Sequence, residues 1–210
     1  MNLLRALAAM AAAVLLAPGL SRATSVIPPT LDELVERADA VVRARVTGTR
    51  CEWWGEGDER HIVTVVSLAV NETLVGAHRS TLQLEFLGGE IDGQRLIVTG
   101  QTRFLPGGED ILFVSRERSA LTPLVRMMYG RYLVGRSDEG RRFVARDNGV
   151  PLASTDEIAT ELASRPPGTV FAQIAAGRTV SPDDFADAVR ASATRLGRTD
   201  VSTVPGGASR

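Results

Sequence analysis

The sequence predicts a mainly β protein with flanking helices: a small antiparallel barrel of the OB type, closed on itself, with a helix before it and helices after it. Three observations favour this fold class. Between residues 40 and 146, apolar and polar side chains alternate in short runs, as on strands that bury one face. Turn residues join these runs without intervening helices, which is typical of antiparallel sheets. Helix-capping patterns lie before and after this region.

The first helix is predicted over residues 30–39. Thr30 and Glu33 have the spacing of a capping box, and Leu31, Leu34 and Val35 supply an apolar stripe. The β segments that follow are predicted over residues 40–46, 61–70, 81–87, 94–99, 111–115, 126–134 and 142–146.

Helical patterns return at Ser154, which is followed three positions later by Glu157. Arg165-Pro-Pro-Gly168 is expected to end this helix. A last helix begins at Ser181, with Pro182 in its first turn, and runs to about Leu196. We therefore expect residues 24–152 to form the barrel domain with its leading helix, residues 153–196 a helical appendage, and residues 197–210, rich in Gly, Ser, Thr and Pro, a disordered tail.

Residues 1–23 have the pattern of a signal peptide. A single positive charge at Arg5 precedes an uncharged Ala- and Leu-rich run, and Ser21-Arg22-Ala23 offers small residues at the cleavage site. Pro18 and Gly19 interrupt the run, which is shorter than the roughly 20 apolar residues of a spanning helix. We expect cleavage after Ala23, export to the periplasm or the medium, and no membrane attachment afterwards.

The composition excludes several classes of protein. The 210 residues are 44% hydrophobic and 23% charged, with a net charge of −1 that falls to −3 once Arg5 and Arg22 leave with the signal peptide. These values do not fit a chain disordered throughout or a generic nucleic-acid coat protein. One cysteine cannot form a disulfide scaffold. All 24 basic residues are arginine, so no lysine can form a Schiff base.

This order of elements resembles a group of exported bacterial proteins of unknown function, which look like small OB-type barrels. The resemblance covers about residues 28–164 and implies fold and compartment but no catalytic residues. Its matching positions are Leu31-Asp-Glu-Leu34 with Ala38-Asp39 and Val41-Val42, Phe104-Leu-Pro-Gly-Gly-Glu109 leading into Ile111-Leu-Phe113, and Gly130-Arg-Tyr-Leu-Val134.

Such barrels are also similar to the inhibitory domain of tissue inhibitors of metalloproteinases. That family clamps a protease zinc with a mature N-terminal cysteine. Here the predicted mature chain begins at Thr24, and Cys51 lies 27 residues downstream. The resemblance therefore does not carry the inhibitory site to this chain.

Sites for nucleotides, metals and cofactors are not predicted. The run from Gly130 to Ser137 approaches a phosphate loop, but Arg136 replaces its lysine and Asp138-Glu-Gly140 turns the chain where a helix should follow. The two histidines, His61 and His78, stand at no metal-ligand spacing.

Two readings of the chemistry of residues 51–61 stay open. Cys51 is either a half-buried thiol or a reactive or intermolecular one, and with His61 it offers the chain's thiol–imidazole pair. Trp53 and Trp54 stand side by side in a Gly-rich acidic segment predicted between two strands. Either both tryptophans pack the barrel and its end, or one is exposed and anchors a protein or a sugar.

An arginine-rich face is the second candidate binding surface. Residues 116–146 contain eight arginines against three acids. Either the arginines form an anion- or polysaccharide-binding face, or Arg131 and Arg141 pair with Asp156, Glu157 or Glu161. The candidate binding residues of this face are Arg126, Arg131, Arg136, Arg141 and Arg142.

Two functions follow from these features. The first is an exported, non-enzymatic binding module for another protein or a glycan, using Trp53, Trp54 and the arginine-rich face, with no nucleic-acid partner. The second is a secreted hydrolase that uses Cys51 and His61 or carboxylates such as Glu85 and Glu90.

Overall fold

The computed structural model describes residues 27–115, 123–162 and 166–198, and the statements below concern these residues. The predicted signal peptide and residues 199–210 of the predicted tail lie outside them. Across the described ranges, no helix combines the length and the apolar character needed to cross a bilayer.

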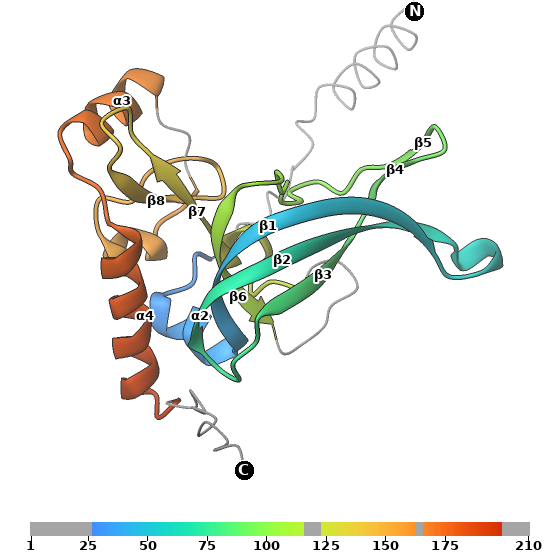
Figure 1. Cartoon of the computed structure of the whole chain (residues 1–210), viewed down its shortest axis with the longest axis horizontal. Helices are drawn as coiled ribbons and strands as arrows, with labels where there is room; N and C mark the ends of the chain where they lie inside the picture. Colours follow the sequence, from blue (N-terminus) through green and yellow to red (C-terminus); the bar gives the residue numbers. More distant parts are fainter. Residues whose placement is uncertain (1–26, 116–122, 163–165, 199–210) are drawn as a thin grey trace, which may run out of the picture.

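One antiparallel sheet of six strands organises the protein (Figure 1). Its strand order is β3-β2-β1-β6-β7-β8, and a separate hairpin, β4-β5, projects beside the long β1–β2 ribbon. The strands are β1 (Ala38–Trp54), β2 (His61–Val75), β3 (Thr81–Leu87), β4 (Gly89–Ile91), β5 (Gln94–Leu96), β6 (Glu109–Ser115), β7 (Arg131–Arg136) and β8 (Arg142–Arg146). The helices are α2 (Leu31–Arg37), α3 (Pro167–Ala175) and α4 (Pro182–Arg195), with short 3₁₀ turns at Gly57–Glu59, Met127–Gly130 and Thr155–Ala159.

The mainly β class with flanking helices is confirmed, but the predicted closure into a barrel is not. Among the described residues, β3 and β8 share no hydrogen bonds and remain at opposite margins of the sheet. The outer side of β8 is taken by irregular chain instead: Val144 N–H donates to the carbonyl of Val180, and Leu152 N–H donates to the carbonyl of Val144, each over 2.9 Å. These bonds occupy the edge that closure would need.

The β1–β2 ribbon is longer than the predicted strands. β1 continues through Cys51 to Trp54, the segment expected to lie between strands. A register shift between Val46 and Gly48 changes which residues share a face of β1. Thr49, Cys51 and Trp53 thereby lie on the same face as Ala44 and Val46, opposite Val66, Thr64 and Ile62 of β2.

Two other predicted strands are shorter than expected. β5 ends at Leu96, and the chain continues to Glu109 without regular pairing. The segment 126–134 opens with Arg126 and Met127 in left-handed backbone conformations and a 3₁₀ turn, so β7 starts only at Arg131.

Two of the predicted helix starts are confirmed by their caps. Glu33 N–H donates to Thr30 Oγ1 over 3.2 Å and Thr30 N–H to Glu33 Oε2 over 2.9 Å, and Asp184 N–H donates to Ser181 Oγ over 3.1 Å. The helix predicted from Ser154 is instead a short 3₁₀ segment, Thr155–Ala159. Ser154 provides no side-chain cap, and Glu157 accepts from Ala153 N–H. Pro166-Pro167, expected to stop a helix, begins α3, since the first turn needs no proline N–H.

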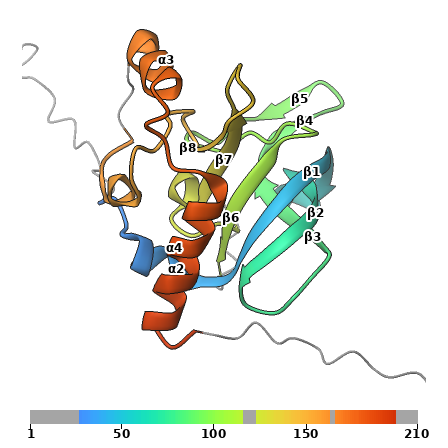
Figure 2. The ribbon, with the colours of Figure 1, turned by 60° about the vertical axis from the view of Figure 1, so that its left-hand side comes forward.

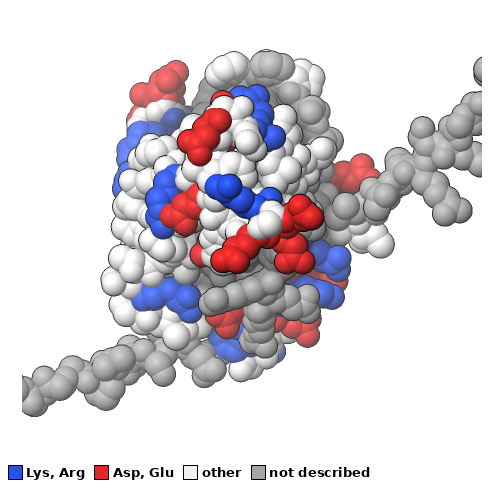
Figure 3. All heavy atoms as spheres, turned by 90° about the vertical axis from the view of Figure 1, so that its right-hand side faces the viewer, with Lys and Arg blue, Asp and Glu red and all other residues white. Residues whose placement is uncertain are grey.

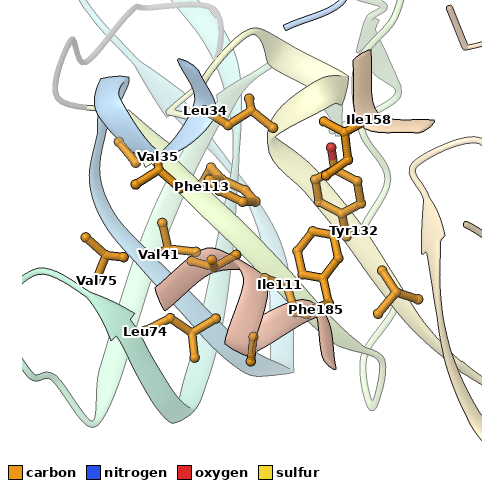
Figure 4. Close-up of a cluster of buried hydrophobic side chains, with 14 of the residues drawn as sticks. Leu34, Val35, Val41, Leu74, Val75, Ile111, Phe113, Tyr132, Ile158 and Phe185 are labelled. Carbon is orange, nitrogen blue, oxygen red and sulfur yellow. The ribbon is translucent and has the colours of Figure 1, made fainter. Parts of the chain in front are cut away.

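The main hydrophobic core lies between the sheet and helices α2 and α4 (Figures 2 and 4). Phe185 of α4 is fully buried, with its ring centroid 4.8 Å from Tyr132 and 6.5 Å from Phe113. Ile158 is buried in the same cluster, and Arg198 donates to the carbonyl of Val35 in α2. The predicted appendage and the first residues of the predicted tail are thus packed against the sheet domain.

A second core covers the opposite face of the sheet. Alternate residues of β1, β2, β3 and β6 form it, and Phe104 and Leu124 close it from outside the strands. The rings of Phe86 and Phe104 lie 5.1 Å apart. The chain after β5 therefore packs across the face that the helices leave open.

Phe185→Ala tests whether α4 belongs to the cooperative core. Loss of a buried aromatic ring costs about 3–5 kcal/mol, so the chemical midpoint should fall sharply in a single transition followed by β-sheet circular dichroism. Phe171→Ala, in the exposed position of α3 with 71% of that residue accessible, is the matched control and should leave the midpoint unchanged. An unchanged sheet transition in Phe185→Ala would show that α4 folds separately.

Candidate functional site

The two tryptophans lie at the end of β1 and face opposite sides of the ribbon. The Trp53 indole N–H donates to Asp92 of the β4–β5 turn over 3.2 Å, and the Arg60 guanidinium lies 4.2 Å from the ring centroid. Trp54 pairs with His61 across the ladder and is 46% exposed. Trp53 therefore holds the β4–β5 hairpin against the ribbon, whereas Trp54 is open to contact.

Figure 3 faces the end of the molecule where the β1–β2 ribbon turns. Acidic and basic side chains lie close to one another there, with uncharged surface around them. Arg50 and Glu52 pair on this ribbon over 2.5 Å. Pairs of this kind partly cancel the local charge, so charge attraction alone does not mark this end as a site for a highly charged ligand.

The predicted arginine-rich face is largely engaged within the protein. Arg142 donates to Glu109 over 2.6 Å, and Arg136 donates to the carbonyl of Gly140 over 2.9 Å. Arg141 donates to the carbonyl of Ala175 over 3.0 Å and lies 3.6 Å from Glu139. Arg126 is exposed at the left-handed turn before β7. Arg136, Arg141 and Arg142 thus bond within the protein. Arg141 and Arg131 do so with other partners than the expected Asp156, Glu157 or Glu161.

Arg131 makes the most extensive of these contacts and is almost fully buried. Its Nε and one terminal nitrogen grip both oxygens of Asp110 over 3.1 and 3.2 Å. The other terminal nitrogen donates to Asp147 over 3.0 Å and to the carbonyl of Arg103 over 2.7 Å. The guanidinium also lies 4.2 Å from the ring centroid of Phe104. We call this group, with Thr102, which donates to Asp147 over 3.4 Å, the Arg131 network.

Burial shifts the pKa values of the two acids of the Arg131 network, Asp110 and Asp147. Desolvation raises the pKa of Asp110, and the attraction of Arg131 opposes the rise without cancelling it. The pKa of Asp147 is raised for the same reason. The network holds residues 102–104 over the sheet at three points: Arg131 bonds to the carbonyl of Arg103, Thr102 bonds to Asp147, and Phe104 lies under the guanidinium.

A groove of about 670 Å³ runs between this fixed segment and the sheet. Its floor includes Thr49, Thr64, Val66 and Phe86 of the β1–β2–β3 surface. The segment from Arg95 to Leu105 and Glu90 of β4 form its other walls. Two aliphatic side chains along it, Ile97 and Leu105, are each 73% exposed. Large aliphatic groups held in water beside a groove typically mark a binding surface.

Cys51 lies beneath one end of the groove, close to the floor. Its Sγ is 3.6 Å from Thr64 Oγ1, which in turn donates to the carbonyl of Gly88 over 2.7 Å. Gly89 passes directly above: a Cβ there would come within 2.6 Å of Cys51 Sγ and 2.7 Å of Thr64 Oγ1. The half-buried thiol is thus covered by a backbone that only glycine permits.

The structure does not bring Cys51 and His61 together. Cys51 pairs with Thr64 and His61 with Trp54, three positions further along the ladder and on opposite faces of the ribbon. His61 Nδ1 instead lies 2.7 Å from the carbonyl of Glu59. Glu90 accepts from Arg95 over 2.8 Å, and Glu85 stands in the β2–β3 ladder opposite Val65. Within the described ranges, no three His, Cys, Asp or Glu side chains cluster as metal ligands would.

Sequence reasoning missed the groove. Residues 94–99 are predicted to form a strand, and this prediction does not reveal that Ile97 is exposed. Leu105 enters the sequence analysis only as part of a turn. Arg131 was singled out for its charge, whereas its importance lies in its burial. The sole sequence signal for the groove was Pro106-Gly107-Gly108, which indicates irregular chain before β6.

Comparison with known proteins adds no assignment. No family model matches the chain, and no curated protein matches it significantly.

Removal of Arg131 should lower the free energy of unfolding substantially. Arg131→Ala leaves Asp110 and Asp147 without their counter-charge, and breaking a buried pair in this way costs about 3–5 kcal/mol of unfolding free energy at pH 7. Arg103→Ala is the matched control, because the Arg103 side chain is exposed and the variant keeps the carbonyl that Arg131 binds. Urea denaturation measures both, and equal midpoints would contradict a structural role for Arg131.

The loss caused by Arg131→Ala should also depend on pH. A carboxyl whose folded pKa lies above its unfolded value near 3.8 favours the folded state at low pH, and this contribution disappears as the pH rises through the folded pKa. Without Arg131 the pKa of Asp110 rises further, so the variant should lose less stability at pH 4 than at pH 7. Thermal melts of variant and wild type across this range test the difference, and a loss that grows towards acid pH would contradict it.

Proposed function

We propose that this protein is an exported binding module whose groove holds an extended apolar segment of another polypeptide. The observation that supports the proposal is the pair Ile97 and Leu105, each 73% exposed beside a groove of about 670 Å³. Burying either side chain against a ligand yields roughly 1.5–3 kcal/mol of favourable free energy. The signal-peptide pattern of residues 1–23 supports a ligand outside the cytoplasm.

The rigidity of the groove supports binding without prior rearrangement. The Arg131 network holds residues 102–104, and the chain beyond Leu105 is bonded to β1: Gly107 N–H donates to the carbonyl of Val46, and Val46 N–H donates to the carbonyl of Gly108, each over 2.8 Å. Arg45 also donates to the carbonyl of Gly107 over 2.8 Å. A wall already ordered in the free protein loses little entropy when a ligand binds.

A polypeptide fits this groove better than a glycan does. Sugar rings stack on exposed aromatic faces, but the aromatic rings of the groove, Phe86 in its floor and Phe104 in its wall, are buried. The exposed side chains along the groove, Ile97 and Leu105, are aliphatic, and they can pack against apolar side chains of a peptide. Thr99 and Gln101 stand along the same wall and offer hydrogen-bonding groups to a peptide backbone.

The groove gives no sign of catalysis. Cys51 lies under Gly89 and on the face of the ribbon opposite His61, so this imidazole does not stand beside the thiol as a base. The acid on the wall, Glu90, is paired with Arg95. We therefore propose a non-enzymatic role for the groove. Trp54 lies on the other face of the ribbon and remains a separate candidate contact for a partner.

Substitution of the two aliphatic side chains tests the proposal. A set of ten-residue peptides with alternating leucine and glutamine or threonine, labelled with a fluorophore, supplies the probes for anisotropy titration. Ile97→Asp with Leu105→Asp should weaken binding of the peptides that the wild type binds by at least about tenfold, since both buried contacts are replaced by charges.

Phe171→Asp is the matched control, because it also puts a charge on a large exposed apolar residue but lies on α3, away from the groove. It should bind as the wild type does. Equal affinity of the double variant and the wild type, or no peptide binding by the wild type, would overturn the proposal. Chito- and cello-oligosaccharides titrated against wild type and Trp54→Ala test the glycan alternative in parallel.

A further inference from the structure

The outer edge of β3 carries a row of unpaired backbone groups. Val70 N–H donates to the carbonyl of Ser80, and Gly88 N–H donates to the carbonyl of Ile62, at the two ends of the β2–β3 ladder. Residues between these two ends pair in one continuous register, so the hydrogen-bonded pairs alternate along the ladder. The N–H and C=O groups of the even-numbered residues 82, 84 and 86 therefore point towards β2. The N–H and C=O groups of residues 81, 83, 85 and 87 therefore point away from the sheet, and no described residue bonds to them.

This edge lacks the features that usually block strand pairing. β3 has seven residues, contains no proline or basic residue, and carries one charge, Glu85. It pairs with β2 without a register shift, whereas β1 and β2 show three. The opposite margin of the sheet, β8, is covered by residues 150–152 and Val180. Figure 2 shows β3 at the margin of the sheet, beside β2. A straight, nearly uncharged edge is a template for another strand.

The sequence of β3 is complementary to itself in the antiparallel direction. A two-fold axis through Leu84 places Gln83 opposite the partner's Glu85, and Thr81 opposite the partner's Leu87. Both are pairs of residues whose backbone groups point outward, so every free N–H and C=O of the edge finds a partner. No like charges stand directly opposite one another. We propose that two copies of this protein pair through β3 in this register and join their six-stranded sheets into one.

The apolar face of the strand supports the same register. Leu84 and Phe86 belong to the second core, and Leu82 is packed against it. The axis puts Leu84 opposite the partner's Leu84 and Leu82 opposite the partner's Phe86, so the second core continues from one copy into the next. Gln83 and Glu85 are exposed on the other face, where an amide and a carboxylate can bond across the strands. The β3 strand of a second copy thus matches this edge in length, in the placement of its apolar and polar side chains, and in charge.

Charge changes at Gln83 test this register in the purified protein. Gln83→Glu puts two carboxylates opposite each other on both sides of the axis, and it should raise the dissociation constant of the dimer about tenfold at low salt. Gln83→Lys puts an ammonium opposite the partner's Glu85 and should lower the constant by a similar factor. Gln83→Ala, which keeps the backbone N–H and adds no charge, is the matched control. Analytical ultracentrifugation gives the constants, and thermal melts verify that all variants are folded.

Amide hydrogen exchange gives a residue-by-residue check. The amides of Gln83, Glu85 and Leu87 should be protected only at concentrations where the dimer forms, whereas those of Leu82, Leu84 and Phe86 should be protected at all concentrations. A protein that stays monomeric to about millimolar concentration overturns the proposal. So does a dimer whose constant is the same in Gln83→Glu and Gln83→Lys. Because Gln83 does not line the groove, these results are independent of peptide binding.

Discussion

The buried guanidinium of Arg131 is the contact on which the rest of this structure depends. It joins Asp110 of β6, Asp147 after β8 and the carbonyl of Arg103 to β7, and it stacks over Phe104. A buried ion pair of this kind adds little net stability compared with apolar residues, because desolvation offsets the attraction. Its effect is geometric, since its donors point in fixed directions and each acceptor must lie where the guanidinium directs.

This geometry explains why the open face of the sheet carries a groove. On one face, α2 and α4 bury the apolar residues of the strands around Phe113 and Phe185. On the other face no described helix packs, and irregular chain brings Phe104 and Leu124 to the core. Chain without secondary structure needs hydrogen bonds for its backbone, and Arg131 supplies one at Arg103. The stretch between β5 and this anchor stands away from the strands and leaves the groove beside Ile97.

The two edge strands of the sheet, β8 and β3, differ in whether other parts of the chain cover them. β8 is covered because the chain after it turns back at Asn148-Gly149 and α4 starts beside it, so Val150 and Val180 reach its free groups. β3 lies far from these segments in the strand order, and no residue of the described ranges pairs with its outer edge. Groove and edge therefore arise from one arrangement: the C-terminal chain covers the β8 margin and the face around Phe113, whereas no described helix packs on the opposite face and no described residue pairs with the outer edge of β3.

The sequence by itself determined what depends on near neighbours. It located the caps at Thr30 and Ser181, the alternating strand 81–87 and the mainly β class, because such signals arise from bonds and side-chain periods within a few residues. It left open whether the arginines form a binding face or pair internally, and the partners it offered for Arg131 and Arg141 are not the ones they have. The tertiary structure alone decided the partners of Arg131, which lie 16 to 28 residues away along the chain. It also determined that the sheet stays open, that Cys51 and His61 lie on opposite faces of the ribbon, and that Ile97 and Leu105 are exposed. These features depend on register and on long-range contacts, and a single bulge after Val46 moves every later side chain of β1 to the other face.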